Sequence, residues 1–170
     1  MTYRERLNAA WDRLDISIVQ EITGILQRSR SVFVIGNGGS QSTAQHLVLH
    51  LRENDIFAVD AMADNAYFTM LSNDYAYDIA PTKYAETWLN GNGNPQTVFA
   101  ISGSGDSENV LDLLRWARCS NVSTVGLYGF GGGKAARLTD SSVCLTSKDY
   151  GIIEDVHLSI VHMIAEALRA

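Results

Sequence analysis

One pattern constrains the fold of this chain more than any other: a short apolar strand, a Gly-rich turn and a helix follow one another twice. In the first copy a β-branched run over 31–35 leads into the turn Gly36–Ser40. In the second copy an apolar run over 97–101 leads into the polar turn Ser102–Ser107. An amphipathic stretch of helical periodicity follows each turn. Strands that alternate with helices in this way predict a parallel sheet with helices on both faces.

The rest of the chain continues the alternation. Further strands are predicted over 56–59, 123–127 and 142–145, which makes a parallel sheet of five strands. Helices are predicted over 4–28, 40–51, 107–118 and 151–168, and over most of 61–90 with an interruption near 72–74, before a loop at 91–95. A length of 170 residues suits one domain, and no linker divides it. We therefore predict a single α/β domain over 1–170, with an N-terminal helical segment (1–29) and an α/β core (31–170).

The predicted N-terminal helix carries a long apolar stripe. Its members recur every three or four residues: Leu7, Trp11, Leu14, Ile18, Ile22 and Leu26. Two interpretations stay open, namely packing on the sheet of the same chain and packing on a second copy of the chain. The second would make residues 1–29 an oligomerisation segment.

Composition excludes several classes of protein. The 13 basic and 19 acidic side chains give a net charge of −6 without a basic cluster, which argues against direct nucleic-acid binding. No apolar run approaches the roughly 20 residues of a membrane helix, and the first residues do not form a signal peptide. Cys119 and Cys144 have no CxxC spacing, so we expect buried, unpaired thiols. These features together indicate a cytoplasmic protein.

Each of the two turns is a candidate anion site. In an open α/β sheet the ligand lies beyond the carboxyl ends of the strands. Both turns stand there and lead into a helix N-terminus, where free N–H groups and the helix dipole favour a negative charge. Neither turn has the Lys-Ser/Thr of a Walker loop, and Gly36–Ser40 lacks the full dinucleotide spacing. The alternative is that the turns only cap the helices.

The first turn belongs to a longer motif that resembles a known family. Val34–Ser40, followed by Ala44-Gln-His46, resembles the signature of the sugar isomerase (SIS) domain and, more narrowly, its phosphoheptose isomerase branch. That branch acts on sedoheptulose 7-phosphate. Further matches occur in the family's order: Leu71–Asp74, Ile101–Ser104 with Ser107, and Glu154–His157 before His162.

The resemblance implies a ligand and an assembly. The ligand would be a phosphorylated sugar, bound in a homotetramer whose active sites are lined by more than one subunit. Substrate contacts are implied for Asn37, Gly38, Gly39, Ser40, Asn73, Asp74, Ser102, Gly103, Ser104 and Ser107. The turn Ser102–Ser107 would hold the phosphate, in agreement with the anion argument.

The family's metal and acid–base positions fall on residues that depart from its pattern. They correspond to His46, His50, Glu154 and His162. The family's catalytic base is a glutamate where this chain has His50, whereas a glutamine is usual at the position of Glu154. An arginine two residues before that position is Ile152 here. A carboxylate is thus lost on one side of the site and gained on the other.

The spacing of these residues suits a metal only in part. His46 and His50 stand at i and i+4, so two imidazoles on one helix face could bind zinc or a similar divalent transition metal. Glu154 and His162 are separated by about 12 Å on a regular helix. They could share one ion only if Glu154 precedes the helix or if they come from different subunits. Glu53 follows His50 on the same face and could supply the missing carboxylate.

Simpler explanations stay open for the same residues. His50 could be an ordinary polar helix residue, and Glu154 a charge at a helix N-terminus. For His157, three residues after Glu154, a structural role is favoured over a catalytic one.

We predict an aldose–ketose isomerase that interconverts sugar phosphates through an enediol. His50 is the expected base and His162 the partner acid, with Glu154 a further catalytic candidate. A metal at His46 would polarise the carbonyl. The alternatives are a non-catalytic SIS protein that binds a replication initiator, and a sugar-phosphate sensor.

Overall fold

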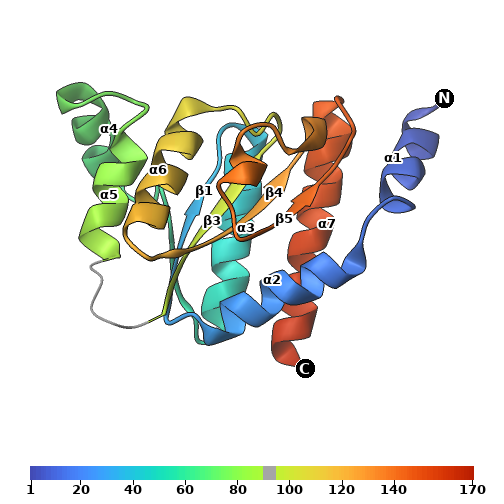
Figure 1. Cartoon of the computed structure of the whole chain (residues 1–170), viewed down its shortest axis with the longest axis horizontal. Coiled ribbons are helices and arrows are strands. Elements are labelled where there is room, and N and C mark those ends of the chain that lie inside the picture. Colours follow the sequence, from blue (N-terminus) through green and yellow to red (C-terminus); the bar gives the residue numbers. More distant parts are fainter. Residues whose placement is uncertain (90–94) are drawn as a thin grey trace.

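The centre of the fold is one sheet of five parallel strands in the order β2-β1-β3-β4-β5 (Figure 1). The computed structural model describes residues 1–89 and 95–170. Its strands are β1 (Ser31–Ile35), β2 (Phe57–Asp60), β3 (Gln96–Ser102), β4 (Ser123–Tyr128) and β5 (Ser141–Cys144). The five predicted strands and their parallel arrangement are thus confirmed.

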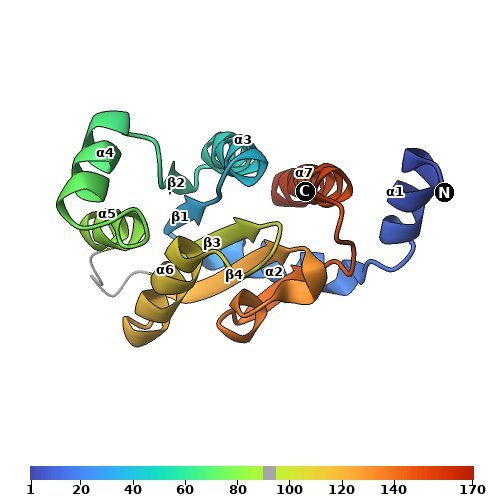
Figure 2. The ribbon, with the colours of Figure 1, turned by 90° about the horizontal axis from the view of Figure 1, so that it is seen from above.

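Helices cover both faces of this sheet (Figure 2). The helices of the described chain are α1 (Tyr3–Trp11), α2 (Ile16–Arg28), α3 (Gly39–Glu53), α4 (Asn65–Asp74), α5 (Ala80–Trp88), α6 (Glu108–Cys119) and α7 (Tyr150–Arg169), of which α1 lies beside α7 and not on the sheet. Alternate strand residues point to opposite faces. Val32 and Val34 join an apolar cluster with α2, α3 and α7, whereas Phe33 and Ile35 join a second cluster with α4, α5 and α6. The core therefore has two halves with the sheet between them, as in other doubly covered parallel sheets.

The N-terminal helix predicted over 4–28 is divided in two. Helix α1 ends at Trp11, and α2 begins after Asp15, whose carboxylate accepts a hydrogen bond from the Ser17 amide (3.0 Å). An aspartate cap of this kind starts a new helix and permits a change of direction. The apolar stripe is divided as well: α2 buries Ile22 and Leu26, whereas α1 has no buried residue.

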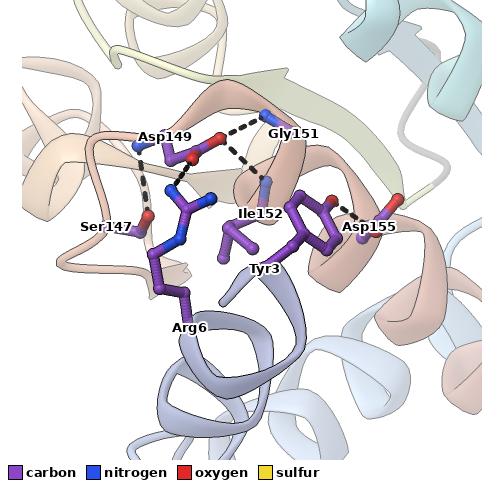
Figure 3. Close-up of polar contacts among 7 residues, drawn as sticks. All are labelled: Tyr3, Arg6, Ser147, Asp149, Gly151, Ile152 and Asp155. Carbon is purple, nitrogen blue, oxygen red and sulfur yellow. Dashed lines mark hydrogen bonds and ion pairs between the residues drawn. The ribbon is translucent and has the colours of Figure 1, made fainter. Parts of the chain in front are cut away.

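Polar contacts hold α1 against the start of α7 (Figure 3). Arg6 forms an ion pair with Asp149, the residue that caps α7 through the amides of Gly151 and Ile152. The hydroxyl of Tyr3 donates to Asp155 at 2.6 Å. This hydrogen bond is the main reason why the pKa of Tyr3 is raised to about 12. Helix α1 is thus attached at its first turns, and its contact with the core is limited to partly buried side chains.

Three smaller expectations have different outcomes. The helical region before the loop is interrupted at 75–79, not at 72–74, because α4 continues to Asp74. Most of the loop predicted over 91–95 lies outside the described residues. Both Cys119 and Cys144 are free as expected, but they are exposed, so their predicted burial is wrong. In the described parts of the chain, no helix is long and apolar enough to cross a membrane.

Candidate functional site

The two Gly-rich turns lie side by side at the carboxyl edge of the sheet. Strands β1 and β3 are hydrogen-bonded neighbours, and the strand order reverses between them. This is where ligands bind in open α/β sheets. The side chains of Asn37, from the first turn, and Asn109, from the first turn of α6, exchange two hydrogen bonds of 2.9 Å. The geometry thus joins the two motifs into one site.

The first turn already faces an anion of its own chain. Gly38 has a φ of 55° and directs the backbone into α3. The carboxylate of Glu154 packs against Gly39, where a Cβ would collide with it. A carboxylate beside the first residues of a helix is favourably placed relative to the helix dipole. The N-terminus of α3 is therefore supplied with negative charge by α7.

The second turn keeps its hydroxyl protons available. The Oγ of Ser102 accepts a hydrogen bond from the Gly105 amide, and that of Ser104 accepts from the Asp106 amide, both at 3.1 Å. Each hydroxyl can still donate its own proton. Ser107 begins α6 and makes no side-chain cap bond to it. The difference between the turns favours Ser102–Ser107 as the site for an external anion.

Three imidazoles converge beyond the first turn. The Nε2 atom of His46, on α3, lies 3.1 Å from Nε2 of His50 and 2.9 Å from Nε2 of His162, on α7. All three ligand atoms lie within 4.8 Å of one another. A nitrogen can donate one proton to only one neighbour, so His46 cannot satisfy both contacts as a donor. Converging nitrogen lone pairs suit a cation, and three histidines form a common ligand set for zinc.

The environment keeps His46 in the form that can bind a metal. Its pKa is lowered, mainly by burial and further by the nearby imidazoles of His50 and His162. A lowered pKa means a neutral ring, which is the form that coordinates. The other nitrogen of His50, Nδ1, lies 2.9 Å from the Glu53 carboxylate.

Glu154 does not join the imidazoles within one chain, so the expected set of four ligands could form only between subunits and stays a prediction. It lies in the regular part of α7, eight residues before His162, and its carboxylate packs on Gly39 instead. Two positions so far apart on one helix are separated by about 12 Å along the axis. Within the described residues, the group with metal-ligand geometry consists of His46, His50 and His162 alone.

The remaining expected contacts surround the turns. Ser40 is buried in the first turn of α3. Asn73 and Asp74 lie at the exposed end of α4, where the Asn73 amide donates to the Asp74 carboxylate (3.0 Å). Gly103 has room for no side chain, because the ring of Tyr150 covers it.

Sequence reasoning missed three residues of this region: Tyr77, Asn109 and Tyr150. The hydroxyl of Tyr77 donates to Oδ1 of Asn37 at 2.7 Å, and this contact brings the segment after α4 to the first turn. The pKa of Tyr77 is raised, mainly by burial. Of these three, only Asn109 has a recognisable signal in the sequence: it is a polar residue in the first helical turn after the candidate anion turn Ser102–Ser107.

Similar proteins identify the family of this chain. The chain is 37% identical over 142 residues to the phosphoheptose isomerase of Mycobacterium bovis (strain BCG / Pasteur 1173P2), covering 79% of this chain and 70% of the relative. It is 30% identical over 167 residues to the probable phosphoheptose isomerase of Thermoplasma acidophilum, covering 95% and 90%. This chain belongs to the phosphoheptose isomerase family. No family model matches it.

Solved structures of this family have the same fold. The phosphoheptose isomerase of Neisseria gonorrhoeae matches with a TM-score of 0.88 at 22% identity, covering 96% of this chain and 91% of that one. That of Francisella tularensis matches with a TM-score of 0.76 at 24% identity, covering 99% of both. The SIS fold inferred from the sequence is confirmed.

Proposed function

We propose that this chain is an aldose–ketose isomerase that acts on a phosphorylated sugar of the sedoheptulose 7-phosphate type. The observation that carries the proposal is the row of groups beside the paired turns. The candidate anion turn Ser102–Ser107 adjoins the first turn through Asn109 and Asn37, and α3, which starts at the first turn, has the Glu154 carboxylate against Gly39 and His46 about 10 Å further along the helix. A sugar phosphate is long enough to contact several of these groups at once. The relatives named phosphoheptose isomerase support the same assignment.

The phosphate would bind at Ser102–Ser107. The hydroxyl protons of the turn and the N-terminus of α6 would donate to its oxygens. One hydrogen bond to a charged group contributes roughly 1.5–3 kcal/mol, so Ser104→Ala should weaken sugar-phosphate binding by about 10-fold or more. Ser120→Ala, at an exposed helix end, is the control. An unchanged dissociation constant in folded Ser104→Ala would locate the phosphate elsewhere.

His46, His50 and His162 would hold zinc or a similar divalent transition metal. When bound, such an ion supplies Lewis-acid polarisation of a sugar carbonyl. Nitrogen ligands favour zinc, nickel or cobalt over magnesium. Both ring nitrogens of His50 have a neighbour: Nε2 lies next to His46 and Nδ1 next to Glu53. Because neither nitrogen is free to act as a base, these contacts favour a ligand role for His50.

Glu154 would then move the proton. Its carboxylate packs on Gly39 at the start of α3, next to the backbone over which the sugar carbons would pass. As a base it would take the proton from the carbon beside the carbonyl, leaving an enediolate, and return it to the former carbonyl carbon, while the hydroxyl proton passes from one sugar oxygen to the other. The second N–H of the Asn37 amide would bind a sugar hydroxyl, since the first donates to Asn109 and the hydroxyl of Tyr77 fixes the orientation of this amide.

Proton exchange tests this function directly. Incubation with sedoheptulose 7-phosphate in deuterated water should give an aldose phosphate that carries deuterium next to the carbonyl. Glu154→Gln should lose this exchange and keep zinc binding, whereas His162→Ala should lose both. Sugar-phosphate binding without exchange would identify a sensor. Absence of both binding and exchange would favour a non-catalytic interaction protein.

We also propose a homotetramer, located in the cytoplasm, whose N-terminal helices pack between subunits. Helix α1 buries no residue, and a cavity of about 400 Å³ separates it from β5. Leu49, on α3 next to His50, is exposed. Apolar surface of this kind is rarely left uncovered, which supports the assembly. The two free thiols suit a reducing compartment, which supports the cytoplasm. Light scattering should give four times 18.6 kDa. A stable monomer at micromolar concentration would contradict the assembly.

A further inference from the structure

The imidazole of His50 faces two different partners with its two nitrogens. Its Nε2 lies 3.1 Å from Nε2 of His46, inside the imidazole group. Its Nδ1 lies 2.9 Å from a carboxylate oxygen of Glu53, on the outer side of the ring. The side chain of His50 is 16% exposed and that of Glu53 is 53% exposed. The carboxylate thus lies behind the ring, at the nitrogen that does not face His46, and it is more exposed than the ring.

The carboxylate determines which nitrogen carries the proton. An ionised carboxylate can only accept hydrogen bonds, and a neutral imidazole has one N–H. The contact with Glu53 therefore puts the proton on Nδ1 and leaves the lone pair of Nε2 directed at His46. We infer that Glu53 is a positioning residue that fixes the tautomer of His50 so that Nε2 is the ligand atom. The inference rests on the proposed metal-binding role of the imidazoles.

An ordinary surface pair of the same spacing shows what is special here. Lys83 and Glu86, on α5, also stand at i and i+3, with a contact of 2.8 Å. The ammonium of Lys83 has no second nitrogen that could bind a metal, so this pair has no way to act on a ligand group. In the His50–Glu53 pair the same interaction reaches the ligand group through the ring. Carboxylates placed behind a ligating histidine typically change metal affinity by 10–100-fold when removed.

Zinc affinity tests the inference with three variants of the full-length chain. Competition with a chromophoric chelator at pH 8 should show zinc bound about 10–100-fold more weakly by Glu53→Ala than by the wild type. Glu53→Gln should lie in between, because the amide oxygen still accepts the Nδ1 proton. Glu86→Ala is the matched control and should bind as the wild type does.

The tautomer itself gives a second readout that needs no metal. Nitrogen NMR of the metal-free protein at pH 8 should show His50 protonated at Nδ1 in the wild type, and a shift towards the Nε2-protonated form in Glu53→Ala. An unchanged tautomer, or zinc affinity of Glu53→Ala within twofold of the wild type, would overturn the role of Glu53. If the wild type binds no zinc, the proposed metal site fails, and the NMR result alone decides the inference on Glu53.

Discussion

Two environments divide the four histidines of this chain. His46, His50 and His162 turn their Nε2 atoms towards one another at an accessible position between α3 and α7. His157 lies on α7 as well, five residues before His162, but it is fully buried. In the described structure neither of its ring nitrogens makes a hydrogen bond of normal geometry.

The two environments have opposite consequences. Burial lowers the pKa of His157 to about 4, and the backbone of Tyr128 opposes this shift only in part. The ring is therefore neutral and acts as a core side chain at ordinary pH. The other three rings face one another and are partly exposed, so an ion or a solvent molecule can reach them. One helix therefore supplies both a structural and a candidate functional histidine, and burial alone does not identify the functional one.

The largest expected difference between the two kinds of histidine is in metal binding. His46→Ala removes one of three converging nitrogens and should weaken zinc binding by at least ~100-fold. His157→Leu should leave the zinc dissociation constant within about twofold, because the buried ring does not reach the group. Calorimetric titration of both variants measures this contrast. Equal losses in the two variants would remove the distinction.

The next effect is the acid sensitivity of folding. In the folded state His157 has a pKa of about 4, whereas the unfolded chain binds this proton near pH 6.5. The stability associated with the neutral ring is fully present above pH 6.5 and is lost as the pH falls towards 4. The loss amounts to about 3 kcal/mol, at about 1.4 kcal/mol per pH unit.

Urea unfolding of the wild type and His157→Leu across this range isolates the effect. As the pH falls from 6.5 towards 4, the free energy of unfolding should decrease by about 3 kcal/mol more in the wild type than in the variant. Carboxylates contribute equally to both proteins. Parallel stability curves would show that His157 binds its proton equally well in the folded and the unfolded state.

The smallest effect is on stability at neutral pH. Replacing a buried imidazole that makes no hydrogen bond of normal geometry by an apolar side chain of similar size is close to neutral or stabilising. His157→Leu should therefore change the free energy of unfolding at pH 7.5 by less than about 1.5 kcal/mol in either direction. A larger loss would indicate that the ring nitrogens of His157 have a partner, such as a buried water, and would weaken the contrast with the other three.

Local sequence pattern determined most of the fold. Runs of β-branched residues such as 31–35, stopped by glycine, became strands, and the apolar periodicity of 151–168 became α7. The parallel arrangement followed from the alternation of these elements, because a helix that returns the chain places consecutive strands in the same direction. The i, i+4 spacing of His46 and His50 likewise determined that both rings share one face of α3.

Spacing along one segment does not tell which distant segments come together. The tertiary structure decided this. His162 contacts His46, which lies 116 residues earlier in the sequence, and Glu154 contacts Gly39 over a similar separation. Periodicity specifies which face of α7 is apolar, but the rotation and height of α7 against α3 depend on the packing of the whole core. The same holds for the hydrogen bond of Tyr77 to Asn37, which joins a segment of irregular structure to a turn. The sequence thus determined the types of group in the site, while packing decided that Glu154 stands apart from the imidazoles.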